Sequence, residues 1–187
     1  MTKLNTSQVS KKLEQLGPPW ALMLIGLPGS GKSTFIKSLR SRFDEDVVVL
    51  STDDIIEARA LAESKTYNQV FSEVSFSVFK AEMESKAAQA RKEKLSVIFD
   101  QTNMSSKSRK AKLEPFLKAG YTCASLSFDV HPKVLHERLD KRAIETGKVI
   151  PVHVLHQMLS GYKTPTREEG FAHTWDFQEH AAFSTKA

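Results

Sequence analysis

Residues 20–34 read Trp-Ala-Leu-Met-Leu-Ile-Gly-Leu-Pro-Gly-Ser-Gly-Lys-Ser-Thr, and this stretch decides the fold. Its first six residues are apolar and stop at a glycine, which is typical of a strand buried on both faces of a sheet. The next segment, Gly26 to Ser33, has the complete spacing of a phosphate-binding loop, and a helical pattern continues from Lys32 to Phe43. The stretch therefore predicts a strand, a glycine loop and a helix.

The polar groups of this loop are those that bind a nucleoside triphosphate. Glycines let the backbone curl so that successive N–H groups face phosphate oxygens, Lys32 bridges the terminal phosphates, and Ser33 offers its hydroxyl to Mg²⁺. A glycine-rich turn beside a lysine is the alternative, which the complete spacing disfavours. We therefore expect ATP and Mg²⁺ as cofactors, bound by Gly26, Pro28, Gly29, Ser30, Gly31, Lys32, Ser33 and Thr34.

The rest of the chain alternates predicted strands with predicted helices. Strands are expected at 47–50, 95–99, 121–128 and 171–177. Helices are expected within a leading segment, 1–18, with Thr6 or Ser7 as cap, and then at about 68–94, 105–120 and 132–145, with another opening at Pro151. Crossover connections imply a parallel sheet covered on both faces. The predicted fold class is α/β, a P-loop NTPase three-layer sandwich with a small helical lid at 131–151, and residues 1–187 form a single domain.

Composition limits the classes of protein that remain. The 187 residues are 40% apolar, enough for one domain with a substantial core. A net charge of +5 and a pI near 9.3 give weak support for a polyanionic partner such as nucleic acid. The apolar runs fall far short of the roughly 20 residues of a membrane span, no signal-peptide core is visible, and the single Cys123 excludes an internal disulfide. We expect a soluble cytoplasmic protein with no membrane partner.

Two acidic clusters follow the second and third predicted strands of the P-loop unit. Because ligands of such sheets bind beyond the carboxyl ends of the strands, Asp53-Asp54 and Asp100 should meet the glycine loop at one edge. Asp53 can accept a proton from an attacking hydroxyl, and Asp100 can help to place Mg²⁺ through water. Asp54 can instead begin and cap the next helix, and an ordinary turn is the alternative for each cluster.

A basic cluster lies in the predicted lid. Arg138, Lys141 and Arg142 share one side of a helix, while Leu135 and Leu139 occupy a neighbouring stripe. One side is expected to pack, and the other to stabilise the charge of a transferring phosphoryl group. A solvated basic face is the alternative.

Four motifs together resemble those of the polynucleotide 5′-hydroxyl kinases, in the same order and spacing. They are Gly-Leu-Pro-Gly-Ser-Gly-Lys-Ser-Thr from Gly26, Ser-Thr-Asp-Asp from Ser51, Asp-Gln-Thr-Asn from Asp100, and Pro-Thr-Arg-Glu-Glu-Gly-Phe from Pro165. The segment around Arg138 and Arg142 is similar to the lid of the phage enzyme of that family. The resemblance covers about residues 21–171.

The resemblance implies roles for individual residues. Asp53 matches the general base, Lys32 and Ser33 the phosphate and Mg²⁺ contacts, and Arg142 and Arg138 two lid arginines. The predicted catalytic residues are thus Asp53, Lys32, Arg142 and Arg138, the acceptor-side residues are Asp54, Thr102 and Asn103, and the metal-placing residues are Ser33 and Asp100.

Two departures from the family pattern keep the acceptor open. Ile56 stands where the phage enzyme has an arginine that grips a phosphate of the acceptor strand, and Gln101 stands where that enzyme has an acidic residue. The favoured function is ATP-dependent phosphorylation of a DNA or RNA hydroxyl, at the 5′ end. The alternatives are phosphorylation of a hydroxymethyl base such as 5-hydroxymethyluracil in phage DNA, a nucleoside or sugar kinase, and a non-catalytic nucleotide switch.

Overall fold

A six-stranded parallel sheet organises the molecule. The computed structural model describes residues 2–43 and 47–178. Within these residues the strands pair in the order β1-β6-β5-β2-β4-β3. They are β1 (Thr2–Leu4), β2 (Trp20–Ile25), β3 (Val47–Leu50), β4 (Ser96–Phe99), β5 (Thr122–Ser127) and β6 (His173–Phe177). The P-loop strand β2 lies between β4 and β5, so the acidic segments after β3 and β4 leave the same edge as the loop.

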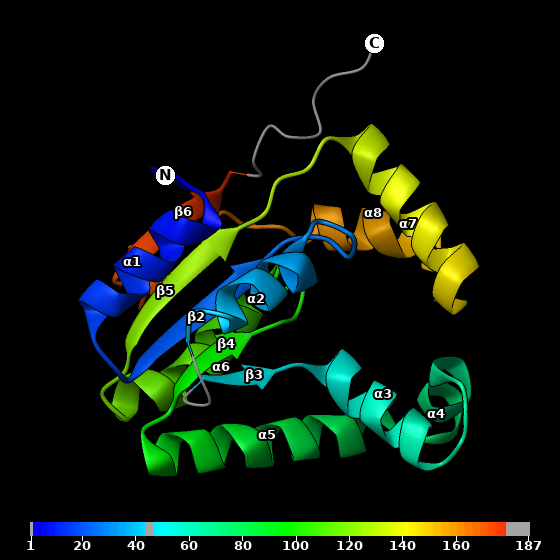
Figure 1. Cartoon of the computed structure of the whole chain (residues 1–187), viewed down its shortest axis with the longest axis horizontal. Coiled ribbons are helices and arrows are strands. Elements are labelled where there is room, and N and C mark those ends of the chain that lie inside the picture. The colour runs from blue at the N-terminus through cyan, green and yellow to red at the C-terminus, as the bar shows by residue number, and fades with distance from the viewer. Residues whose placement is uncertain (1, 44–46, 179–187) are drawn as a thin grey trace.

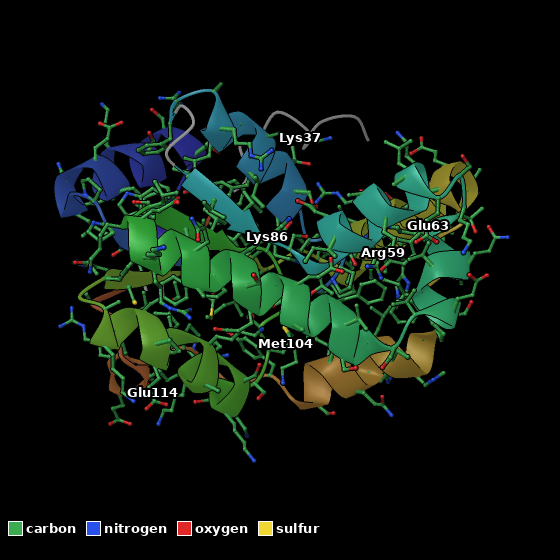
Figure 2. The ribbon with its side chains drawn as sticks, turned by 90° about the horizontal axis from the view of Figure 1, so that it is seen from below. Lys37, Arg59, Glu63, Lys86, Met104 and Glu114 are labelled. Atoms are coloured by element: carbon green, nitrogen blue, oxygen red, sulfur yellow. The ribbon has the colours of Figure 1, made fainter. Side chains whose placement is uncertain are left out.

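Helices connect successive strands and cover both faces of this sheet (Figure 1). Seen from below, α5 crosses the lower face with α6 beside it (Figure 2). The described helices are α1 (Thr6–Leu16), α2 (Lys32–Arg40), α3 (Thr52–Ala62), α4 (Tyr67–Glu73), α5 (Phe76–Glu93), α6 (Ser106–Lys118), α7 (Pro132–Thr146), α8 (Val152–Ser160) and the 3₁₀ helix η1 (Arg167–Glu169).

The side chains of β2 divide between two cores. Ala21, Met23 and Ile25 face one cluster with residues of α3, α5 and α6, whereas Leu22 and Leu24 face a second cluster with residues of α1 and α2. All six β2 residues are buried, because helices cover both faces. The predicted three-layer α/β sandwich with a P-loop NTPase fold is therefore confirmed.

The N-terminal segment differs from the single leading helix predicted at 1–18. Its first residues form β1, which pairs with β6 in parallel register. Helix α1 begins only after Asn5, whose side chain accepts from the Gln8 N–H while the Gln8 side chain accepts from the Asn5 N–H. The cap is therefore Asn5 and not Thr6 or Ser7. A strand of three residues is too short to leave a period in the sequence.

The long helix predicted at about 68–94 is also wrong, because it is two helices. Val74 and Ser75 have extended backbone angles between α4 and α5. A capping box between Thr66 and Gln69 begins α4 separately, and Val74 packs against the core. This break places α4 beside α3 at the site edge of the sheet (Figure 1).

The helix predicted at 132–145 is confirmed as α7, and the helix predicted to open at Pro151 is confirmed as α8. Figure 1 shows α7 and α8 on one side of the sheet's carboxyl edge and α3 and α4 on the other. No helix in the described part of the chain is long and apolar enough to cross a membrane.

Candidate active site

The glycine loop joins β2 to the first turn of α2. Gly31 precedes α2 with φ of +100°, in the left-handed region that favours glycine. At Gly26 a Cβ atom would lie 2.8 Å from Ser30 Oγ and 2.9 Å from the Phe128 carbonyl, so no side chain fits there. The Gly26 N–H donates to the Thr102 carbonyl at 3.0 Å, which ties the loop to the segment after β4. The loop thus presents the N-terminus of α2 in the arrangement that suits a phosphate.

The ammonium of Lys32 lies inside the loop. It donates to the carbonyls of Gly26 at 2.9 Å and Leu27 at 2.8 Å. Burial lowers the pKa of Lys32 to about 8, partly opposed by the negative charge of Asp100. The loop therefore holds a positive charge at neutral pH, where the predicted role of Lys32 needs it.

Asp100 is the acidic group with the largest electrostatic effect on Lys32. Its N–H donates to the Leu50 carbonyl at 3.0 Å, which fixes the end of β4 beside the end of β3. Burial raises the pKa of Asp100 to about 6, although Lys32 opposes the shift, so the carboxylate is ionised at neutral pH.

The residues predicted to hold Mg²⁺ fit that ion. Ser33 is exposed in the first turn of α2, and Asp100 supplies a carboxylate. Mg²⁺ takes oxygen ligands and usually binds through one or two protein groups together with phosphates and water. Within residues 2–43 and 47–178 no three His, Cys, Asp or Glu side chains form a metal-binding group.

Asp53 lies in the first turn of α3, at the same edge of the sheet. The cap of α3 is Ser51, whose hydroxyl accepts from the Asp54 N–H at 3.1 Å, so the alternative prediction that Asp54 caps the helix is wrong. The Asp53 side chain is about half exposed, at 52%, and its Oδ2 lies 3.5 Å from Arg142 Nη2. A carboxylate held by a lid arginine and still open to solvent can accept the proton of an incoming hydroxyl.

Helix α7 lies over the glycine loop with its apolar stripe inward. A Cβ atom on Gly29 would lie 3.2 Å from Leu139 and 3.3 Å from Leu135, and a Cβ atom on Gly31 would lie 3.7 Å from Arg138 Nη1. Leu135 and Leu139 therefore pack on the loop as predicted, Arg138 lies on the loop side of α7, and Arg142 lies beside Asp53. Lys141 differs, because its side chain is 74% exposed and its ammonium lies 3.8 Å from Glu145.

Asn103 does not have the surroundings of an acceptor contact. It is 3% exposed, and its amide nitrogen donates to the carbonyls of Leu24 and Gln101, while its oxygen accepts from Lys112. Both polar atoms of its amide are used within the protein, so the structure gives Asn103 a structural role, and its place on the acceptor side stays a prediction. Its φ of +49° shows that it shapes the turn after β4. Thr102 contributes its carbonyl to Gly26, as described above.

Two buried residues behind this turn were missed by the sequence analysis. Arg109 of α6 donates to both carboxylate oxygens of Glu169, at 2.7 and 2.6 Å, and to the carbonyls of Asn103 and Met104. Glu169 lies in the motif from Pro165, so that motif is held to the turn after β4 by an ion pair. The ion pair joins residues 60 positions apart, so no local pattern in the sequence predicts it.

Tyr67 and Lys148 complete the surroundings of Asp53 and were also missed. The Tyr67 hydroxyl donates to Asp53 Oδ1 at 2.7 Å, and Lys148 Nζ lies 4.0 Å from Oδ2. Lys148 also pairs with Glu57 and lies 3.7 Å from the centre of the Tyr67 ring. These residues come from α4 and from the segment after α7, which are far apart in the sequence.

A cavity of about 500 Å³ adjoins the glycine loop, which is within the range of small-molecule pockets. Its lining includes Gly26, Leu27, Ser30, Ser127, Phe128 and Tyr162. The buried hydroxyl of Ser127 has no hydrogen-bond partner among the described residues.

The sequence model of the AAA_33 family, described as an AAA domain, matches residues 22–165. A chain of the Pnkp1/Rnl/Hen1 RNA repair complex superposes with a TM-score of 0.59 and 26% identity, over 77% of this chain and 44% of that chain. This chain thus spans less than half the length of that repair protein. No curated protein sequence matches significantly.

Two further solved structures show the fold alone. A candidate kinase from Chloroflexus aurantiacus has a TM-score of 0.62 at 16% identity, over 89% of this chain and 87% of that chain. A chain of the PezAT toxin-antitoxin system of Streptococcus pneumoniae has a TM-score of 0.63 at 15% identity, over 92% and 76%. Both likenesses agree with the α/β fold and phosphate-binding loop described above.

Proposed function

We propose that this chain, which belongs to the AAA_33 family, transfers the γ-phosphate of ATP to a hydroxyl of DNA or RNA, with the 5′-hydroxyl end as the first candidate. The observation that carries the proposal is the half-exposed carboxylate of Asp53, 3.5 Å from Arg142 of the helix that covers the glycine loop. A nucleotide switch has no need of a base at this place, whereas a kinase does.

In the proposed reaction, Asp53 accepts the proton of the acceptor hydroxyl. The acceptor oxygen then bonds to the γ-phosphorus, and the bond from that phosphorus to the bridging oxygen breaks, so that ADP leaves. Lys32, Arg138 and Arg142 stabilise the charge that spreads over the transferring group. Mg²⁺, placed by Ser33 and Asp100, would neutralise phosphate charge and orient the phosphates.

The RNA-repair neighbour at 26% identity supports a nucleic-acid acceptor. The net charge of +5 is compatible with one. Together they favour a polynucleotide over a free sugar or nucleoside.

A second candidate acceptor, a hydroxymethyl group on a DNA base, is favoured by the position of Ile56. The corresponding arginine of the resembling phage enzymes grips a strand phosphate, but here Ile56 is 1% exposed and packs in the core with Ile55 and Ala60. Position 56 therefore offers no cation to the phosphates of a nucleic-acid strand that enters the site by its 5′ end. Either another residue binds that phosphate, or the acceptor hydroxyl is on a base.

Incubation with γ-labelled ATP and Mg²⁺ tests the proposal across acceptors. The panel is a 5′-hydroxyl DNA oligonucleotide, the same sequence as RNA, a 5′-phosphorylated duplex containing 5-hydroxymethyluracil, the same duplex with thymine, and free nucleosides. We expect label on a 5′-hydroxyl end or on the hydroxymethyl duplex, with the thymine duplex and Lys32→Met as blanks. Label only on free nucleosides, or only on water as phosphate, would contradict a nucleic-acid kinase.

A further inference from the structure

Asp53 has a neutral hydrogen-bond donor besides its charged neighbours. The Tyr67 hydroxyl lies 2.7 Å from Asp53 Oδ1, which is a short O–H···O contact, whereas Arg142 and Lys148 lie 3.5 and 4.0 Å from Oδ2. The two carboxylate oxygens therefore have different surroundings. Oδ1 is engaged by the phenol, and Oδ2 is the oxygen on the side of the lid cations.

Packing on both sides holds the Tyr67 ring in place. Phe71 stacks against it with ring centres 6.0 Å apart and an angle of 10° between the planes. The ammonium of Lys148 lies 3.7 Å from the ring centre, and the Lys148 side chain, which also pairs with Glu57, is only 10% exposed. A phenol fixed in this way can restrain a carboxylate that is itself half exposed.

A second contact joins α4 to the segment after α7. The Asn68 amide donates to the Gly147 carbonyl at 3.2 Å. The break between α4 and α5 allows this hydrogen bond, because it lets α4 run in a different direction from α5. The tyrosine is therefore held between elements on both sides of the site.

The Tyr67 hydroxyl remains protonated at the pH at which a kinase works. Burial raises the pKa of Tyr67, and the hydrogen bond to Asp53 raises it further. The phenol is therefore a constant donor that does not compete with Asp53 for the substrate proton.

From this geometry we infer that Tyr67 is a positioning residue: its hydroxyl fixes Asp53 Oδ1 so that Oδ2 is directed to the acceptor hydroxyl. The inference rests on the proposed function, in which Asp53 is the base. Without the phenol, the carboxylate of Asp53 would turn about its side-chain torsions, and fewer encounters with the acceptor would have the geometry for proton transfer.

Tyr67→Phe removes this one hydroxyl and keeps the ring between Phe71 and Lys148. We expect kcat for transfer to fall about tenfold, on the scale of a lost orienting contact, with the KM for ATP within about twofold of the wild-type value. In an Asp53→Ala background the same change should lower the residual rate by less than about twofold, because there is no carboxylate left to position.

Tyr121→Phe is the matched control. The Tyr121 hydroxyl donates to the carbonyls of Ala90 and Leu95, at 2.9 and 2.8 Å. Tyr121 belongs to the core cluster that also contains residues of α5 and α6. This variant should lower the melting temperature without lowering kcat. Phe71→Leu, at a position 51% exposed, loosens the Tyr67 ring without removing the hydroxyl, and kcat should fall about threefold.

Wild-type kcat in a folded Tyr67→Phe variant would overturn the inference, as would an equal loss in the Asp53→Ala background. If Tyr67→Phe does not fold, an unchanged kcat in Phe71→Leu overturns it instead. Undiminished transfer by Asp53→Ala alone would contradict the proposed base, which separates failure of the function from failure of the positioning role.

Discussion

Burial narrows the pH range in which Lys32 and Asp100 are both ionised. It lowers the pKa of Lys32 to about 8 and raises the pKa of Asp100 to about 6, so both are ionised between these values. The ammonium of Lys32 rests on loop carbonyls at 2.8 and 2.9 Å, which shows that its position is determined by the protein itself. The loop is therefore charged for phosphate near pH 7.

The lowered pKa of Lys32 predicts that ATP affinity decreases in alkali. Above about pH 8 the free protein loses the Lys32 proton, and ATP must then bind a neutral amine or restore the proton. Affinity should fall towards tenfold per pH unit between pH 8 and 9.5, measured by calorimetry at fixed Mg²⁺. Lys32→Met should bind weakly at every pH with a much flatter profile. A flat profile for the wild-type protein would contradict the charge assignment.

At the scale of elements, α6 and η1 hold the turn after β4 in place. Arg109 and Glu169 are 0% and 1% exposed, and Arg109 also donates to two carbonyls of that turn. In the same turn, the Thr102 carbonyl accepts a hydrogen bond from the Gly26 N–H. The motif from Pro165 therefore supports the glycine loop from behind.

Glu169→Gln should destabilise the protein by about 3 kcal/mol, because it leaves the buried Arg109 charge uncompensated. Urea unfolding measures this free energy. Glu114→Gln breaks the exposed pair with Lys118 on the same helix and should cost less than about 0.5 kcal/mol. Equal effects of the two variants would show that the buried pair has no special structural role.

Helix α7 carries the second element-scale prediction. Arg142 lies near Asp53 while Leu135 packs on the loop, so the arginine is presented to the site by a packed helix. Arg142→Ala should lower kcat by about 10² or more and change the KM for ATP only a few-fold, if the contact forms mainly in the transition state. Arg91→Ala, on α5, is the comparison and should leave kcat unchanged. A rise in KM at constant kcat would assign Arg142 to nucleotide binding alone.

For the whole molecule, the sequence predicted the elements that have a strong local signal. The apolar run of β2, the glycine loop and the leucine stripe of α7 each follow a period or a spacing, and each is where it was expected. The same local reasoning placed Asp53 and Asp100 at one edge of the sheet, because parallel strands end together.

What could not be predicted depends on contacts between distant segments. Three-residue β1 is a strand only because β6 pairs with it, and α4 separates from α5 where Val74 packs against the core. Tyr67 has its partner 14 positions away, and Lys148, which follows α7, lies near Asp53 although the two are far apart in the sequence. Such residues are recognised from the assembled site and not from a motif.

The most direct test of the account is phosphoryl transfer by Asp53→Asn, measured together with ATP binding and thermal melting. The variant keeps the shape of the side chain and removes the base. We predict ATP affinity within a few-fold of wild type, a closely similar melting temperature, and transfer to the acceptor lower by about 10² or more. Transfer at the wild-type rate by a folded, ATP-binding variant would contradict the assignment of Asp53 as the base, and with it the proposed kinase mechanism.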